Sequence, residues 1–309
     1  MTRPATTLVV GTRTSRLARW QTDWVLERLS ASGAPVRFDV RPFVTTGDAV
    51  QDTPLPQIGR RGVFTTELEQ ALRSGEIDLA VHSLKDLPTE EMPGLAIGAV
   101  PVRADARDVL VTRQGGGLAS LPEGARVGTS SLRRTAQLRA LRPDLDVQPI
   151  RGNVDTRVRK VQDGQYDAAV LAAAGLLRLG LDAYAGERFA LDMMVPAPGQ
   201  AALAVQCRAE DAATRVLLAA INDPQAEAAT RAERTFLHTL GGGCSVPVAA
   251  YAAPGLPGQG LRLVGLVLSV DGTRRIRVEG HGEDAALLGA DLARRALERG
   301  AAALLHHER

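Results

Sequence analysis

Two residues of the sequence, Asp86 and Cys244, stand where a carboxylate and a thiol can do chemistry. Asp86 follows an apolar strand in "AVHSLKDLP", where a carboxylate near a buried apolar floor can hold a developing cation or accept an N–H hydrogen bond. Lys85 beside it can bind a ligand carboxylate. Cys244 lies in the glycine turn "LGGGCSVP", which gives a thiol room to attack a carbon electrophile. The plainer readings are a polar loop and a small buried side chain.

The segment "GTRTS", residues 11–15, follows a predicted strand and opens a predicted helix. A helix N-terminus offers free backbone N–H groups and the positive end of the helix dipole to an anion. Ser15 can cap this helix, and Arg13 can reach the same anion. A simple capped helix without a ligand explains the motif as well.

The segment "VGTSSLRRTAQLR" repeats this arrangement later in the chain. Arginine in a first helical turn opposes the helix dipole unless an anion is present, so the sequence favours an anion site over a solvated face. The segment is not a P-loop, because the Gly-Lys-Ser/Thr pattern is missing. The residues expected to bind the anion are Thr129, Ser130, Ser131, Arg133 and Arg134.

A third basic cluster follows the strand "LDVQPI" in "IRGNVDTRVRK" and contains Arg151, Asn153 and Arg157. Ligands of open α/β sheets bind at the carboxyl ends of the strands. Several guanidiniums at such ends suit a substrate with several carboxylates, since each can bind one bidentately.

The elements that must position these residues alternate between strand and helix. The pattern predicts two α/β lobes with mixed, mainly parallel sheets, followed by a small α+β domain. We expect the first lobe to be discontinuous, with residues 1–101 joined by 199–220. The second lobe covers 102–198 and the C-terminal domain 221–309. A strand after "APGQAA" is expected to return to the first sheet.

Composition excludes several classes of protein. The 309 residues carry a net charge of +2, only 3% are aromatic, and just two of the 37 basic residues are lysines. Near-neutral charge and few aromatic residues argue against nucleic-acid binding. Two cysteines cannot form a disulfide framework, no zinc-site spacing occurs, and no apolar run is long enough for a signal peptide or membrane span. We therefore expect a cytoplasmic protein without a metal.

Taken together, the motifs closely resemble the porphobilinogen deaminase (hydroxymethylbilane synthase) family. The resemblance runs in order through "GTRTSRLARWQ", "VTTGD", "VFTTELEQAL", "DLAVHSLKDLPT", "VGTSSLRR", "IRGNVDTR", "DAAVLAAAGLLRLG", "APGQAALAV" and "GGGCSVPVA". No single motif is decisive, but the ordered set is specific and covers nearly the whole chain.

This resemblance implies two lobes with the topology of periplasmic binding proteins and a third domain that carries a covalent dipyrromethane cofactor, linked by a thioether to Cys244. It implies a transferase of porphyrin and haem biosynthesis. The enzyme joins four porphobilinogen molecules head to tail, releases ammonia at each addition, and uses water to free the linear tetrapyrrole hydroxymethylbilane. The expected partners are porphobilinogen and water, and the expected state is a monomer.

By the same resemblance Asp86 is the catalytic carboxylate. Cofactor binding is expected from Cys244, Lys85, Asp86, Thr129, Ser130, Ser131, Arg133, Arg134 and Arg151. Substrate binding is expected from Arg13, Ser15, Phe64, Arg151, Asn153 and Arg157, with Phe64 packing over a pyrrole ring.

The chain departs from the family pattern at two places, where Arg61 replaces a common lysine and Ala201 replaces a glycine of "GQGA". These changes bear on loop geometry and on the hinge. A rival hypothesis is a cytoplasmic anion-binding module that kept the scaffold and lost catalysis, since a fold does not fix a function. The presence of Asp86 and Cys244 argues against it, because a binding protein needs neither.

Overall fold

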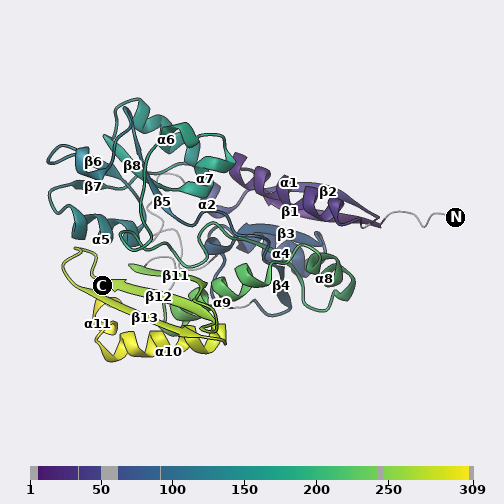
Figure 1. Cartoon of the computed structure of the whole chain (residues 1–309). Helices are drawn as coiled ribbons and strands as arrows, with labels where there is room; N and C mark the ends of the chain where they lie inside the picture. The colour runs from purple at the N-terminus through teal and green to yellow at the C-terminus, as the bar shows by residue number, and fades with distance from the viewer. Residues whose placement is uncertain (1–5, 34, 50–61, 91, 243–245, 306–309) are drawn as a thin grey trace. The chain divides into compact units, whose positions relative to one another are not determined.

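The computed structural model describes residues 6–33, 35–49, 62–90, 92–242 and 246–305 (Figure 1). The chain divides into two compact units. Unit 1 contains Met1–Arg103 and Ala202–Glu227, and unit 2 contains Ala104–Ala201 and Ala228–Arg309. The finer domain boundaries expected from the sequence stay a prediction.

Unit 1 is built on a five-stranded sheet with the order β2-β1-β3-β10-β4. Strand β1 runs parallel to β2 and β3, whereas β10 runs antiparallel to β3 and β4. The strands are β1 (Thr6–Arg13), β2 (Val36–Phe43), β3 (Leu79–Ser83), β4 (Leu95–Ala99) and β10 (Leu203–Arg208). The helices are α1 (Arg16–Ala31), α2 (Thr46–Ala49), α4 (Thr66–Ser74), the 3₁₀ turn η1 (Leu84–Asp86) and α8 (Ala212–Ala219).

Helices cover both faces of this sheet, which explains why β3 is almost continuously buried. Leu79 and Val81 pack in one cluster with Val25 of α1, and Ala80 packs in another with Leu68 of α4. Successive side chains of a strand point to opposite faces. The strand after "APGQAA" returns to this sheet as β10, as the sequence predicted.

Unit 2 begins with a second five-stranded sheet, ordered β7-β6-β8-β5-β9, that repeats the plan of the first. Strand β6 is parallel to β7 and β8, and β5 is antiparallel to β8 and β9. The strands are β5 (Asp108–Thr112), β6 (Arg126–Gly128), β7 (Asp146–Gln148), β8 (Ala168–Ala172) and β9 (Ala185–Arg188). The helices are η2 (Leu118–Ser120), α5 (Leu132–Leu141), α6 (Val154–Gln162), α7 (Ala173–Arg178) and η3 (Asp182–Tyr184).

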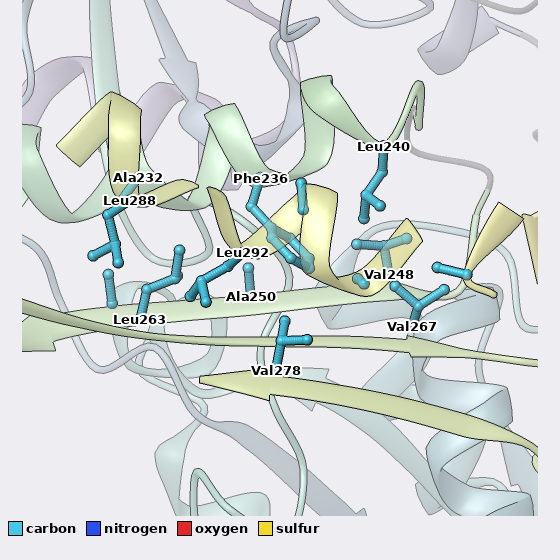
Figure 2. Packing of buried hydrophobic residues seen from close by; sticks show 14 of the residues in the cluster. Ala232, Phe236, Leu240, Val248, Ala250, Leu263, Val267, Val278, Leu288 and Leu292 are labelled. Carbon is cyan, nitrogen blue, oxygen red and sulfur yellow. The ribbon is translucent and has the colours of Figure 1, made fainter. Parts of the chain in front are cut away.

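The C-terminal part of unit 2 is an antiparallel sheet, β11-β12-β13, packed against helices. Its core contains Phe236, Leu292 and Val267 (Figure 2). Gly265 is needed there, because a Cβ would come within 2.4 Å of the Phe236 ring. The elements are α9 (Pro224–Thr239), which begins in unit 1, then β11 (Val248–Pro254), β12 (Leu261–Leu268), β13 (Arg275–Gly282), α10 (Ala285–Glu298) and α11 (Ala302–Leu305). Two mixed α/β sheets and a small α+β part confirm the predicted fold class.

Candidate functional site

Ser15 and Arg13 lie where β1 gives way to α1. The Ser15 hydroxyl accepts a hydrogen bond of 3.2 Å from the backbone N–H of Ala18, so Ser15 caps the helix as the sequence indicated. The Arg13 guanidinium binds the Asp48 carboxylate through Nε at 3.0 Å and Nη2 at 2.6 Å. Asp48 belongs to the "VTTGD" motif. The motif was recognised in the sequence, but the pairing was not predicted.

The Asp48 carboxylate also accepts a hydrogen bond of 2.7 Å from the Thr45 hydroxyl. Burial alone would raise the pKa of Asp48, but the hydrogen bonds from Arg13 and Thr45 and the Arg13 charge outweigh burial and lower that pKa. Asp48 is therefore ionised at neutral pH and holds the Arg13 side chain in one orientation.

Phe64 lies against one face of the same guanidinium, whose edge is bound by Asp48. The Cζ atom of Arg13 is 4.2 Å from the centre of the Phe64 ring, a cation–π distance. Gly47 allows the ring to approach, because a Cβ there would lie 2.2 Å from a ring carbon. The structure therefore brings together Arg13 and Phe64, two of the residues expected to contact substrate.

Asp86 and Lys85 lie on the short turn η1 that follows β3. The turn is fixed by its neighbours Leu84 and Leu87, whose side chains are buried, and by a hydrogen bond of 3.0 Å from the Leu84 N–H to the Ala202 carbonyl. Both polar side chains are partly exposed. Among the described residues, no hydrogen bond or ion pair reaches the Asp86 carboxylate. An anchored, unpaired carboxylate can turn its full charge on a bound ligand.

Ser83, at the end of β3, is held by α1. The Gln21 amide donates a hydrogen bond of 2.9 Å to the Ser83 hydroxyl. This contact ties the strand that leads to Asp86 to the helix that follows Arg13. Neither residue was singled out as a site residue from the sequence, because the two are 62 positions apart.

His82 precedes this serine and is buried on the α4 face of the sheet. Desolvation, with a further contribution from the Arg13 charge, lowers the pKa of His82 to about 4. The imidazole is therefore neutral at pH 7. A side-chain hydrogen bond with Gln206 opposes this lowering of the pKa in part.

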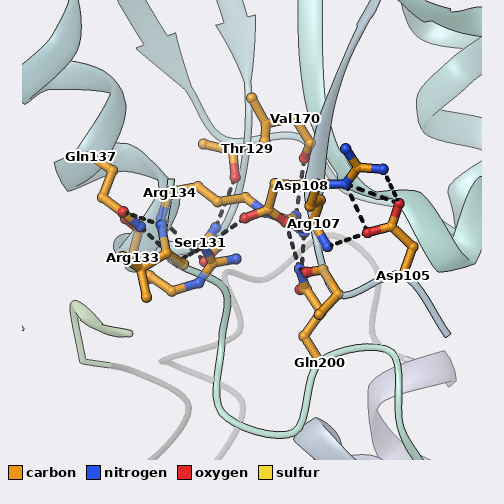
Figure 3. A network of polar contacts seen from close by, with 12 residues as sticks. Asp105, Arg107, Asp108, Thr129, Ser131, Arg133, Arg134, Gln137, Val170 and Gln200 are labelled. Atoms are coloured by element: carbon orange, nitrogen blue, oxygen red, sulfur yellow. Dashed lines mark hydrogen bonds and ion pairs between the residues drawn. The ribbon is translucent and has the colours of Figure 1, made fainter. Parts of the chain in front are cut away.

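In unit 2, the two arginines of "SSLRR" share one carboxylate (Figure 3). Nη1 of Arg133 lies 2.6 Å from Oδ2 of Asp108, and Nη2 of Arg134 lies 2.7 Å from Oδ1. Burial alone would raise the pKa of Asp108, but the two positive charges and their hydrogen bonds lower it far below the ordinary value. Desolvation and the neighbouring Arg134 charge lower the pKa of Arg133, against the opposing effect of Asp108.

Hydroxyl groups border this cluster. Ser131 caps α5 by accepting a hydrogen bond of 3.4 Å from the Arg134 N–H, and the Thr129 hydroxyl accepts one of 3.2 Å from the Ser131 N–H. The Ser130 hydroxyl donates to the Ile150 carbonyl at 2.7 Å. This last bond connects the loop after β6 to the loop after β7. The structure thus joins the second and third sequence motifs.

The loop after β7 is folded back on α6, whose N-terminal flanking residue is Asn153. Nε of Arg157 donates to the Gly152 carbonyl at 2.8 Å, and Lys160 donates to the Arg151 carbonyl at 3.2 Å. Gly152 has a φ of 107°, which favours glycine. The loop that carries Arg151 is therefore held from the helix side by two cations.

Cys244 and Arg61 lie outside the described residues. The described chain reaches Gly242 after α9 and resumes at Val246 before β11. In the parts of the chain that the structure covers, no three His, Cys, Asp or Glu side chains gather to hold a metal ion. No helix in those same parts is both long and apolar enough to cross a bilayer.

Comparison with known proteins gives matches over nearly the whole chain. A family model described as "porphobilinogen deaminase, dipyromethane cofactor binding domain" matches residues 8–216, and one for the C-terminal domain of the same family matches residues 228–298. A porphobilinogen deaminase of Roseiflexus castenholzii is 50% identical over 96% of this chain and 98% of its own length. One of Brevibacillus brevis is 45% identical over 96% of both chains.

Solved structures of binding proteins show more distant likeness. A methionine-binding lipoprotein of Bacillus subtilis matches with a TM-score of 0.42 and 13% identity, over 71% of this chain and 92% of that one. The methionine-binding protein MetQ matches with a TM-score of 0.45 and 13% identity, over 72% and 92%.

Proposed function

Because the chain belongs to the porphobilinogen deaminase family, we propose that it performs the family reaction with Asp86 as catalytic carboxylate and Cys244 as cofactor attachment point. The reaction joins four porphobilinogen molecules head to tail, releases one ammonia per molecule, and yields hydroxymethylbilane for porphyrin biosynthesis. The family supports the activity as such.

The carboxylate of Asp86 is the observation that carries the mechanism. Loss of ammonia from the aminomethyl group leaves an azafulvene-like cation, which a fixed anion stabilises. Asp86 suits this task because its turn is anchored by Leu84 and Leu87 and because no other described residue binds its oxygens. A carboxylate with free lone pairs can also accept the pyrrole N–H hydrogen bonds that orient the ring.

Arg13 is proposed to bind a substrate carboxylate. Asp48 occupies its Nε and one N–H of Nη2, which leaves other N–H donors of the guanidinium for a ligand. Phe64 at 4.2 Å offers a ring face beside it on which a pyrrole can pack. Ser15 is proposed as a supporting donor at the same helix N-terminus.

The residues of the segment "VGTSSLRR", here called the cofactor-binding motif, fit a polycarboxylate such as dipyrromethane. Two guanidiniums around one carboxylate leave a net charge of +1, which favours an added anion. We assign cofactor contacts to Lys85, Asp86, Thr129, Ser130, Ser131, Arg133, Arg134 and Arg151, and further substrate contacts to Arg151, Asn153 and Arg157. When bound, the dipyrromethane supplies the terminal pyrrole carbon to which the first porphobilinogen is joined.

The attachment point is tested by the intact mass of the purified protein. We expect an excess mass of two linked pyrrole units, located by peptide mapping on the Cys244 peptide. Protein made in cells that cannot synthesise porphobilinogen is the control and should show the mass of the bare chain. Unmodified Cys244 in protein from porphobilinogen-competent cells would rule out covalent attachment there, and would favour an anion-binding module that lost catalysis.

The protein is further proposed to act as a cytoplasmic monomer on small molecules, without nucleic acid or membrane. A thioether needs a free thiol, and thiols stay reduced in the cytosol. The other cysteine, Cys207, is a buried free thiol. Sedimentation of the purified protein should give the mass of one chain. A dimer at micromolar concentration would contradict the monomer, and activity in a membrane fraction would contradict the location.

A further inference from the structure

The Asp108 carboxylate is the shared anchor of the two arginines in the cofactor-binding motif. Its side chain is fully buried, and those of Arg133 and Arg134 are 4% and 7% exposed. Oδ1 accepts hydrogen bonds from Nε and Nη2 of Arg134 at 3.1 and 2.7 Å, and Oδ2 accepts one from Nη1 of Arg133 at 2.6 Å. Breaking such a pair leaves a buried charge uncompensated, so Asp108 fixes both guanidiniums.

The two arginines keep different donors for a ligand. In Arg134 the Nε–Nη2 edge is occupied by Asp108, the second N–H of Nη2 reaches Oε1 of Gln200 at 3.5 Å, and Nη1 donates to the Val170 carbonyl at 3.0 Å. Arg134 therefore retains one N–H of Nη1. In Arg133, Nη1 uses both of its N–H groups, on Asp108 and on the Val195 carbonyl at 2.8 Å.

The opposite edge of Arg133 has no partner among the described residues. Its Nε atom is buried and unpaired, and Nη2 makes no hydrogen bond to another described residue. Nε and Nη2 lie on one edge of the planar guanidinium, and this edge takes a carboxylate bidentately. A buried N–H without an acceptor costs free energy, which a bound carboxylate would recover.

Two glutamines hold the groups that accept hydrogen bonds from Nη1 of Arg133. Gln137 donates to the Val195 carbonyl at 3.0 Å and accepts from the Val195 N–H at 2.8 Å. Gln200 donates to Oδ1 of Asp108 at 2.8 Å and to the Ala106 carbonyl at 2.8 Å (Figure 3). Both acceptors of Arg133 Nη1 are thus themselves held in place.

We propose that Asp108 is a positioning residue for cofactor binding: it directs the free Nε–Nη2 edge of Arg133 toward one cofactor carboxylate and restricts Arg134 to a single N–H contact. This inference rests on the proposed function, since it assumes that the two arginines bind the cofactor. It adds a residue and a division of roles within the pair. Asp108 itself touches no ligand.

The test is a comparison of cofactor-loaded and cofactor-free protein in the Asp108→Asn variant. A bound cofactor raises the melting temperature according to its interaction with the folded state. We expect the melting-temperature difference between loaded and free protein to shrink in the variant. We also expect the loaded fraction, measured by intact mass, to fall roughly tenfold, the factor expected from losing one charge-assisted hydrogen bond.

The matched control is Asp105→Asn. Asp105 forms an ion pair of 2.7 Å with Arg107 shortly before β5, but its side chain is 30% exposed and contacts neither Arg133 nor Arg134. The control should leave both the loaded fraction and the melting-temperature difference unchanged. A purely structural role of Asp108 predicts equal losses of melting temperature in loaded and free protein, with the difference preserved. That result would overturn the proposal.

A second variant covers the case in which Asp108→Asn does not fold. Asp108→Glu keeps the charge and moves the carboxylate by one methylene, so it should fold and still shrink the difference. Two results count against a positioning role. One is an Asp108→Glu variant that is fully loaded with cofactor and shows the same melting-temperature difference between loaded and free protein as the parent. The other is failure of both variants to fold. If the parent protein itself carries no cofactor, the proposed function fails and this inference with it. If the parent is fully loaded with cofactor, the proposed attachment holds, and a failed test of the variants then counts against the positioning role alone.

Discussion

Arg13 binds Asp48 through two parallel hydrogen bonds, from Nε at 3.0 Å and from Nη2 at 2.6 Å. The two residues are 35 positions apart, one at the end of β1 and the other in α2. Bidentate pairs of this kind fix the plane of the guanidinium as well as its position. Asp48 therefore determines which N–H groups Arg13 presents to a substrate.

Replacing Asp48 with asparagine should weaken substrate binding. Arg13 would lose its charged partner and the fixed orientation, so we expect KM for porphobilinogen to rise roughly five- to tenfold, with a smaller change in kcat. Initial-rate kinetics of the cofactor-loaded enzyme measure both. Asp23→Asn is the control, because Asp23 pairs with Arg19 on the exposed face of α1 and should change neither parameter. A lower KM would instead mean that Asp48 competes with substrate for Arg13.

Asp86→Asn should separate catalysis from stability. The Asp86 carboxylate has no partner among the described residues, so its neutralisation should leave the melting temperature within about 2 °C of the parent. Loss of the anion that stabilises the cation should lower hydroxymethylbilane formation by roughly 100-fold or more. A stopped assay of product per loaded chain gives the rate.

The reciprocal control for Asp86 is Asp78→Asn. Asp78 forms an ion pair of 2.7 Å with Arg208 and accepts the Val9 N–H at 2.9 Å, away from the η1 turn. We expect this variant to lose about 1–3 kcal/mol of stability and to keep the parental rate per folded molecule. Normal product formation by Asp86→Asn would remove Asp86 from the catalytic role.

Local features of the site were predictable from the sequence, whereas long-range pairings were not. Ser15 and Ser131 act as helix caps, and a cap depends only on residues within one turn. The cap at Ser15 was expected, whereas Ser131 was expected only as an anion-binding residue. The ordered α/β pattern likewise predicted two sheets. The partners of the arginines depend on which strands become neighbours in the fold. Asp48 and Asp108 were therefore missed as partners, although both are visible in the sequence as acidic residues.

Burial was a second limit of sequence reasoning. His82 stands in a polar motif, yet the alternation of β3 turns it inward beneath α4, where it is almost fully covered. Nothing in the local sequence distinguishes this neutral imidazole from an exposed one. The lowered pKa of His82 makes the stability of the folded protein depend on pH.

Stability should fall on acidification because of His82. The pKa of His82 is lowered from 6.5 to about 4, so the unfolded chain binds a proton at higher pH than the folded protein. The contribution of neutral His82 to the free energy of unfolding is fully present above pH 6.5 and is lost as the pH falls toward 4. Between pH 7.5 and pH 5 we expect a loss of about 2 kcal/mol from this residue.

Urea unfolding at these two pH values measures the effect, with His82→Gln as the comparison. Glutamine does not titrate, so the variant should be less sensitive to pH in this window, whatever its stability at pH 7.5. His281→Gln is the control, because His281 lies on β13 and its side chain is exposed. Equal pH dependence in the parent and in His82→Gln would contradict the lowered pKa.

Ala201→Gly should stabilise the protein. Ala201 has a φ of 69°, and among the described residues no other non-glycine residue has a positive φ. A side chain in the left-handed region costs about 1–2 kcal/mol. Glycine removes this strain, but it also raises the conformational entropy of the unfolded chain, which offsets part of the gain. The net gain should be about 0.5–1 kcal/mol in urea unfolding. Ala202→Gly, at the next position but without a positive φ, should have the opposite sign. Loss of stability in Ala201→Gly would mean that the buried methyl group of Ala201 contributes more through packing than the backbone strain costs.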